Sequence, residues 1–138
     1  MNEERLRLLA AFRSDLRQFH HASEQLCAGQ GLTAQHYQAL LALAAAGRQS
    51  PVTVSVLAQQ LHIKHNSAVG LVDRMEGFGL AERHPSEADR RSVVIEITAH
   101  GRQLLRRLAE AHWRELHRLA PAFLQHFSVF AAEPPPRR

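Results

Sequence analysis

The side chains of this chain that could carry chemistry are its arginines, its histidines and one cysteine. The 138 residues include 17 basic residues, 16 of them arginine, against 13 acidic ones, so the formal net charge is +4. This excess of positive charge is compatible with an anionic partner, nucleic acid included, without identifying one. Ten histidines are the compositional oddity, because imidazole can transfer protons, bind metal ions and change charge near neutral pH.

The sequence patterns that place such groups in an enzyme site are absent. The chain has no H-E-x-x-H zinc-protease pattern, no P-loop and no G-x-S-x-G nucleophile elbow. His62 and His65 have an H-x-x-H spacing, but they fall in a predicted turn beside a predicted helix. We therefore predict a protein that is not an enzyme and that has no cofactor.

One set of residues has the ligand types of a zinc site, namely Glu24, Cys27, His36 and His112. The set contains no close ligand pair at i and i+4, so we predict no metal site. Cys27 is the only cysteine and cannot form an internal disulfide. No basic residue adjoins it to lower the pKa of its thiol, which disfavours peroxide sensing. Zinc or redox sensing by these residues stays as an alternative interpretation.

The length of the chain fits one globular domain with a sizeable core. No apolar run approaches the ~20 residues that span a bilayer, and the charged start lacks the apolar region of a signal peptide. We therefore expect a cytoplasmic protein with no membrane partner.

Four helices are predicted in the first 79 residues. The first has a seam with spacings of three and four, formed by Leu9, Phe12, Leu16, Phe19, Ser23 and Leu26, in which only Ser23 interrupts the apolar pattern. Thr33 is a good N-cap for a second helix that stops at Gly47, and Thr53 is placed to cap a short third one. A tight turn at 62–64 then leads to a fourth helix over 65–77. Two short helices joined by a tight turn predict a helix-turn-helix.

A β-hairpin is predicted directly after these helices. Residues 80–84 and 92–97 are β-compatible, and the second segment is rich in β-branched side chains. The loop between them contains a proline and the adjacent pair Arg90 and Arg91. A charged hairpin in this position is typical of a wing, and it favours contact with DNA over a merely solvated turn.

The last third of the chain is predicted to be helical. Thr98 is a candidate N-cap for a long helix, which Pro121 should break or kink before a further short helix over 122–130. The apolar side of the long helix is marked by Leu105, Leu108, His112, Leu116 and Leu119. The helices at the two ends have more apolar surface than a small winged core can cover. We predict that a homodimer buries it, with ordinary packing inside one chain as the rival explanation.

The predicted fold class is therefore mostly α with a small β-hairpin, a winged helix-turn-helix with terminal dimerisation helices. We expect an N-terminal dimerisation helix in residues 1–32 and a winged helix-turn-helix lobe in 33–98. C-terminal dimerisation helices should occupy 99–132, and the proline-rich residues 133–138 should form a disordered tail.

Residues 32 to about 108 resemble the MarR (multiple antibiotic resistance regulator) family of winged helix-turn-helix transcription regulators. The resemblance rests on LT at 32–33, VLAQQL at 56–61, LVDRME at 71–76, GL at 79–80, DRR at 89–91 and IT at 97–98. GL follows LVDRME after two residues, and DRR matches the D-x-R signature of the family. The resemblance implies a homodimeric repressor that places one recognition helix per subunit in successive major grooves of a palindromic operator.

The resemblance also implies which residues lie at or near double-stranded DNA: Lys64, His65, Asn66, Ser67, Val69, Gly70, Arg74, Asp89, Arg90 and Arg91. Asn66 is the candidate for a bidentate contact with adenine. Arg90 or Arg91 would enter the minor groove or contact a phosphate, and Asp89 would shape the hairpin and pair with an arginine. Arg74 is an alternative phosphate or wing contact.

Two positions depart from the family pattern. Gly70 stands where relatives often carry a longer side chain, at a cost of ~1 kcal/mol to the helix, and its use could be a close approach to DNA. Lys64 replaces the serine expected as N-cap. Either the recognition helix starts one residue later, or Asn66 caps it and does not contact a base.

Family members are commonly released from DNA by a small aromatic or phenolic effector, bound between the dimerisation helices and the winged lobe. Arg17, His20 or His36 could supply the polar contacts for such an effector, although single histidines in helices are more often surface or core groups. One alternative is a zinc- or redox-responsive regulator of the same fold. A further alternative is a winged-helix module that binds another protein.

Overall fold

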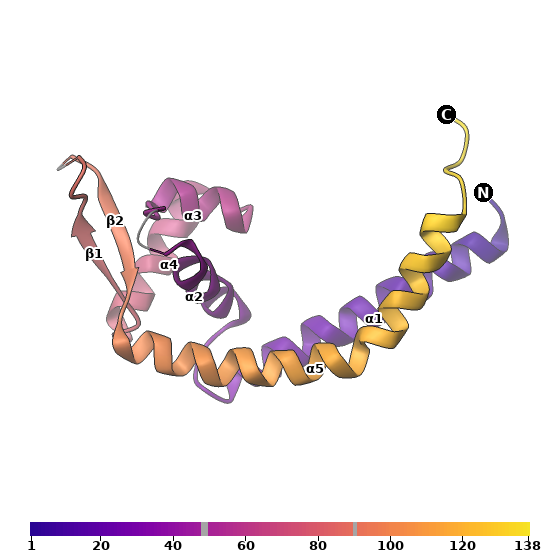
Figure 1. Ribbon diagram of the computed structural model, residues 1–138, viewed down its shortest axis with the longest axis horizontal. Coiled ribbons are helices and arrows are strands. Elements are labelled where there is room, and N and C mark those ends of the chain that lie inside the picture. Colours follow the sequence, from indigo (N-terminus) through magenta and orange to yellow (C-terminus); the bar gives the residue numbers. More distant parts are fainter. Residues whose placement is uncertain (48–49, 90) are drawn as a thin grey trace.

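The computed structural model describes residues 1–47, 50–89 and 91–138 (Figure 1). Along these residues the elements are α1 (Glu3–Ala28), α2 (Ala34–Ala46), α3 (Val54–Leu61), α4 (His65–Gly77), β1 (Ala81–Pro85), β2 (Val93–Ile97) and α5 (Ala99–Ala132). The predicted fold class, mostly α with one hairpin, is confirmed. None of the helices in the described part of the chain is long and apolar enough to cross a membrane.

The helix starts predicted at three threonines are confirmed by hydrogen bonds. The side-chain oxygens of Thr33, Thr53 and Thr98 each accept from the backbone N–H three residues further on, at 3.2, 3.2 and 3.0 Å. Each bond satisfies an N–H group that has no partner inside its helix, so the threonine determines where the helix begins. His62 has a left-handed φ of 55° and closes the tight turn between α3 and α4.

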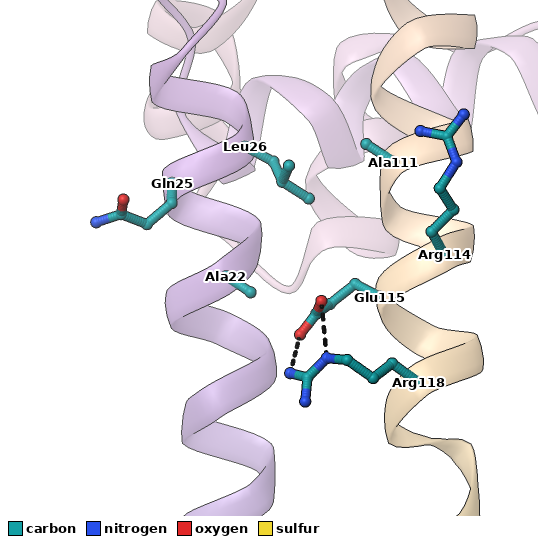
Figure 2. Close-up of a pocket in the computed structure, with 7 residues that line it drawn as sticks. All are labelled: Ala22, Gln25, Leu26, Ala111, Arg114, Glu115 and Arg118. Atoms are coloured by element: carbon teal, nitrogen blue, oxygen red, sulfur yellow. Dashed lines mark hydrogen bonds and ion pairs between the residues drawn. The ribbon is translucent and has the colours of Figure 1, made fainter.

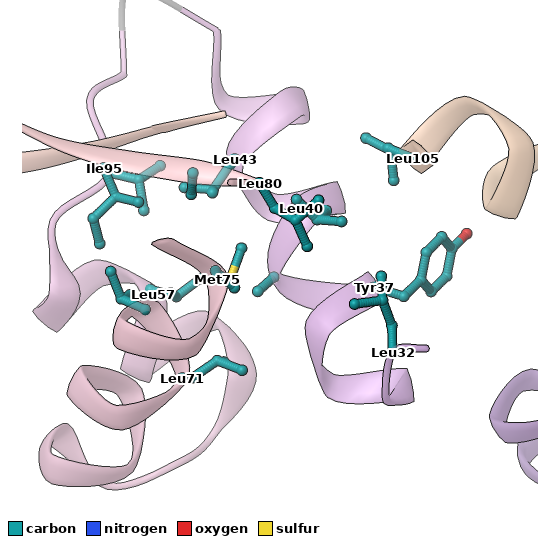
Figure 3. Packing of buried hydrophobic residues seen from close by; sticks show 14 of the residues in the cluster. Leu32, Tyr37, Leu40, Leu43, Leu57, Leu71, Met75, Leu80, Ile95 and Leu105 are labelled. Atoms are coloured by element: carbon teal, nitrogen blue, oxygen red, sulfur yellow. The ribbon is translucent and has the colours of Figure 1, made fainter. Parts of the chain in front are cut away.

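The winged lobe consists of α2, α3, α4 and the hairpin, packed around one core (Figure 3). Its fully buried large side chains are Leu40, Leu57, Leu71, Val72, Met75 and Leu80. β1 and β2 are antiparallel, with Arg83 opposite Ile95. An additional bridge joins Val52 to the hairpin, where the Ile95 N–H donates to the Val52 carbonyl at 2.8 Å. The hairpin is therefore fastened to the lobe along β2.

The arm of the molecule is formed by α1 and the distal part of α5. Figure 1 shows α5 passing along the base of the lobe and then running beside α1, so that both termini lie at the far end. α5 is continuous through Pro121, so the separate short helix expected over 122–130 is wrong. A proline removes one helical hydrogen bond, and bending can accommodate that loss. Figure 1 shows α5 bending in its C-terminal part.

Aromatic packing joins the distal ends of α1 and α5. The Phe12 ring of α1 lies edge-on to those of Phe123, Phe127 and Phe130, with centroids 5.7–6.1 Å apart. Beside this cluster, His126 Nε2 lies 2.6 Å from the Asp15 carboxylate. The apolar seam of α1 is thus partly covered by α5 of the same chain. For this part of the apolar surface, packing inside one chain is the explanation.

Candidate nucleic-acid interface

The N-terminus of α4 is open to solvent. Lys64 is the N-cap residue, its side chain makes no capping hydrogen bond, and His65, Asn66 and Ser67 in the first turn are exposed. The helix begins at His65, so both alternatives suggested by the lysine are wrong: the start is not delayed, and Asn66 is not the cap. The uncapped N–H groups, with a lysine beside them, form an environment that favours an anionic group.

One side of α4 faces away from the core along the whole length of the helix. Asn66, Gly70, Asp73 and Gly77 are spaced by four, three and four, so they lie on the side opposite the buried Ala68 and Met75. Asn66 and Asp73 are exposed and Gly70 is half-buried. A helix that offers a polar stripe free of large side chains has the shape required to enter a major groove.

The surroundings of Gly70 and Gly101 differ in whether they leave room for a side chain. A Cβ added at Gly70 would meet only the Arg74 Nη1 atom, at 3.4 Å, so packing inside the chain does not require glycine there. A Cβ added at Gly101, in the first turn of α5, would come within 2.2 Å of the Leu80 carbonyl oxygen. Gly101 is therefore required by the fold, whereas the bare surface at Gly70 is available to something outside the chain.

The tip of the wing is organised by Asp89. Its carboxylate accepts from the Arg91 backbone N–H at 3.0 Å and from the Ser92 hydroxyl at 3.4 Å. Its own N–H donates to the hydroxyl of the buried Ser86 at 3.4 Å. These bonds bend the loop and leave the Arg91 side chain exposed. Arg90, the other arginine expected to contact DNA, lies outside the described residues.

Arg83 in β1 was not among the expected site residues, yet it connects the wing to α4. Its Nη2 lies 2.8 Å from the Asp73 carboxylate, its Nη1 contacts Glu76, and Nη2 donates to the Val69 carbonyl at 3.4 Å. The half-buried Val69 thus contributes its backbone to this contact. The signal that could have found Arg83 is a basic residue in the first wing strand, combined with acidic residues three apart on α4.

Comparison with known proteins identifies the family of one segment. Residues 30–92 match the model described as MarR family. These residues, which include the helix-turn-helix and most of the wing, form a MarR-family segment. PecS of Dickeya dadantii, an HTH-type transcriptional regulator, is 33% identical over 81 residues, which are 59% of this chain and 49% of PecS. The transcriptional activatory protein BadR of Rhodopseudomonas palustris is 32% identical over 91 residues, or 66% of this chain and 52% of BadR. The chain thus spans about half the length of these relatives.

Solved structures share the fold. A mutant of MepR from Staphylococcus aureus, bound to an oligodeoxyribonucleotide, has a TM-score of 0.67 and 20% identity, covering 80% of this chain and 79% of MepR. The apo form of MarR from E. coli has a TM-score of 0.73 and 17% identity, covering 97% and 98%. The winged helix-turn-helix architecture is therefore the one adopted by MarR-family structures.

The three residues considered for a MarR-family effector have different surroundings. Arg17 and His20 are exposed on α1, whereas His36 is buried at the start of α2. His36 Nδ1 accepts from the Thr33 N–H at 3.0 Å, which completes a capping box. Burial, and after it the charge of Arg74, lowers the pKa of His36. His36 thus acts as a neutral structural group, and its bond to Thr33 requires an unprotonated Nδ1.

A hollow between α1 and α5 does not include these three residues. It has a volume of about 460 Å³ (Figure 2). Its lining is formed by Ala22, Gln25, Leu26, Ala111, Arg114, Glu115 and Arg118. Arg118 is already paired with Glu115 at 2.5 Å inside this hollow.

Among the residues considered for metal sensing, His112 makes hydrogen bonds and a stacking contact within the chain. Within residues 1–47, 50–89 and 91–138, no three His, Cys, Asp or Glu side chains come together to hold a metal ion. His112 donates from Nδ1 to the Leu108 carbonyl at 2.6 Å, so its Nε2 accepts from the Ser23 hydroxyl at 2.7 Å. The ring stacks on Tyr37, with centroids 3.9 Å apart.

Cys27 lies beside this buried group, and Glu24 is exposed. Burial raises the pKa of the Cys27 thiol, against a smaller lowering by its hydrogen bond with Ser23. A raised pKa reduces the thiolate fraction, which is the form that reacts with oxidants. The surroundings of Cys27 are therefore those of a packed structural cysteine.

Proposed function

We propose that this chain is a sequence-specific DNA-binding transcription regulator, not an enzyme, that acts in the cytoplasm on a palindromic operator. The observation that carries the proposal is the outward stripe of α4, with its uncapped N-terminus, next to a wing that exposes Arg91. Asn66 would contact a base, while Lys64 and Arg91 would contact phosphates or the minor groove. The DNA-bound structure of MepR supports this use of the fold.

The second part of the proposal is a homodimer held by the arm. Large apolar side chains are exposed there at Leu9, Trp113, Leu116, Leu124 and Phe127. Those on α5 are spaced by three, eight and three, so they form one stripe that a second copy can cover. In such a dimer the two lobes would present two recognition helices to two half-sites about 34 Å apart.

The third part of the proposal concerns regulation. The MarR-family segment supports a repressor that a small aromatic or phenolic effector releases from its operator, although the name of BadR shows that activating relatives exist. Transcription in vitro from a promoter that contains the operator measures the sign directly, as less transcript for a repressor. Aromatic acids added to that reaction should restore transcription, and no restoration by any of them would contradict the effector.

The test of DNA binding is fluorescence anisotropy with two duplexes, one from the DNA beside this protein's own gene and one with the same bases scrambled. We expect tight binding to the first only, with an affinity that falls steeply as salt is raised. Asn66→Ala should reduce the preference between the duplexes, and Arg91→Ala should weaken binding to both.

The matched control is Arg106→Ala, which removes the same charge from an exposed position on α5. We expect it to bind like the wild type. Equal and weak binding to both duplexes by the wild-type chain would contradict the proposal and would favour a winged helix that binds protein.

A further inference from the structure

We infer that Arg83 is a positioning residue for DNA recognition: by clamping Asp73 and Glu76 it sets the angle between the wing and the recognition helix α4. The inference rests on the proposed function, because these two elements are the ones we expect to contact DNA. The sequence resemblance assigned no role to this arginine, and neither the wing tip nor the first turn of α4 contains it.

Arg83 faces the lobe from the inner side of the hairpin. Residues directly opposite each other in an antiparallel pair point to the same face, and the partner of Arg83 is Ile95, which is buried in the core. The guanidinium therefore reaches α4 from a strand whose pairing partner is itself fixed. It meets Asp73 at 2.8 Å and the Val69 carbonyl at 3.4 Å, and it also contacts Glu76.

The contacts of Arg83 constrain both the distance and the orientation of β1 relative to α4. Asp73 and Glu76 are one helical turn apart, and a guanidinium has donors in a rigid planar fork that can meet two carboxylates at once. Three contacts to one helix, from Val69 to Glu76, leave the strand little freedom to rotate about the helix. A clamp of this kind fixes where the wing tip lies relative to the first turn of α4.

The clamp also changes the charge that α4 presents. Asp73 lies on the same outward stripe as Asn66 and Gly70, so its carboxylate would repel the phosphates of a DNA strand in the groove. Pairing with Arg83 compensates that charge from the protein side. The pair is partly exposed, with Arg83 at 29% and Asp73 at 61% side-chain exposure, so its contribution to folding stability should be small.

The opposite face of the same hairpin offers a matched control. Glu82 and His84 flank Arg83 and point away from the lobe, where His84 Nε2 lies 3.1 Å from Glu82 and 3.8 Å from Glu96. Both contacts are between residues of the hairpin itself. Removing them tests whether any loss of a wing ion pair has the same effect.

The first measurement needs no DNA. Spin labels are attached through Ser67→Cys on α4 and Glu87→Cys in the wing loop, in a Cys27→Ser background, and the labelled chain is mixed and exchanged with an excess of unlabelled chain so that a dimer carries one label pair. The distance distribution of that pair is measured by pulsed electron resonance. We expect one narrow distribution in the labelled parent, a broadened or shifted one with Arg83→Gln, and no change with Glu82→Gln. An unchanged distribution with Arg83→Gln would overturn the inference.

The second measurement is operator affinity. We expect Arg83→Gln to weaken operator binding roughly tenfold or more, a change of at least about 1.4 kcal/mol. Arg106→Gln, which removes the same charge elsewhere, should have little effect. Arg83→Lys should give an intermediate loss because it keeps the charge without the fork. Equal losses for Arg83→Gln and Arg106→Gln would overturn the positioning role.

The two measurements separate this inference from the proposed function. If the wild-type chain binds no DNA, the proposed function fails, and the distance distributions alone decide whether Arg83 clamps the wing. Thermal melting of each variant guards against unfolding, and we expect the Arg83→Gln transition to stay within a few degrees of the wild type.

Discussion

The winged lobe and the arm bury their apolar side chains to opposite extents. In the lobe, Leu40, Leu57 and Leu71 are fully buried, whereas Trp113 and Leu124 in the arm are 77% and 69% exposed. In Figure 1, α2, α3, α4 and the hairpin surround the core of the lobe, while the arm consists of α1 beside the distal part of α5. The lobe is complete in one chain, whereas in the proposed homodimer a second arm would cover the exposed side of the first.

The largest effect should come from placing charge on the exposed side of the arm. We expect the double variant Leu116→Glu/Phe127→Glu to be monomeric at micromolar concentration, because two buried carboxylates without partners would oppose association. Light scattering after size exclusion measures the mass. Gln125→Glu, exposed elsewhere on the same helix, should stay dimeric, and a dimeric double variant would place the interface elsewhere.

Shortening one leucine in each region sharpens the same comparison. In the monomeric background, Leu40→Ala should lower the free energy of unfolding by roughly 2–5 kcal/mol, because it leaves a cavity in the core. Leu124→Ala should lower it by less than about 1 kcal/mol, since the side chain is already solvated. Urea titration measures both. Similar losses would mean that the arm is covered within one chain.

The two glycines should respond in opposite directions to alanine. Gly101→Ala should destabilise the fold by about 1–3 kcal/mol, since the added methyl collides with the Leu80 carbonyl. Gly70→Ala should stabilise α4 by up to about 1 kcal/mol and still weaken DNA binding. Thermal melting and anisotropy give the two readouts. A Gly70→Ala chain that binds DNA as tightly as the wild type would show that DNA does not approach there.

The smallest effect concerns His36 and pH. Its pKa is lower in the folded chain than the value of about 6.5 expected when unfolded, so the unfolded chain binds more protons as the pH falls through that value. This contribution to stability is therefore present above pH 6.5 and is lost on acidification. His36→Gln keeps an acceptor at the third helical position and cannot titrate. Its urea midpoint should fall less between pH 7.5 and 5.5, and an equal fall would contradict this role of His36.

Features with a local cause could be predicted from the sequence. The caps at Thr33, Thr53 and Thr98 depend on a side chain and a backbone N–H three residues away, and the bounds of α4 follow from its apolar period. The wing followed from β-branched residues after a helix-turn-helix. Each of these signals lies within a few residues of the feature that it determines.

Features that depend on contacts between distant segments could not be found this way. The Arg83 clamp requires the register of the hairpin against α4, and the bridge at Val52 joins residues 43 positions apart. Ser23 appeared to interrupt the seam of the first helix, but its hydroxyl meets His112 on α5. Pro121 was expected to break or kink the long helix before a further short one, but α5 is a single helix whose distal part packs against Phe12.

Sedimentation of the chain with its operator duplex is the most direct test of the proposed dimer. It tests whether the arms hold two chains together and whether the two lobes of this dimer bind one DNA duplex. We expect a complex of two chains and one duplex for the wild type, and a much weaker complex for Leu116→Glu/Phe127→Glu at equal concentrations. One chain per duplex, with the same affinity for both proteins, would contradict the division of roles between lobe and arm.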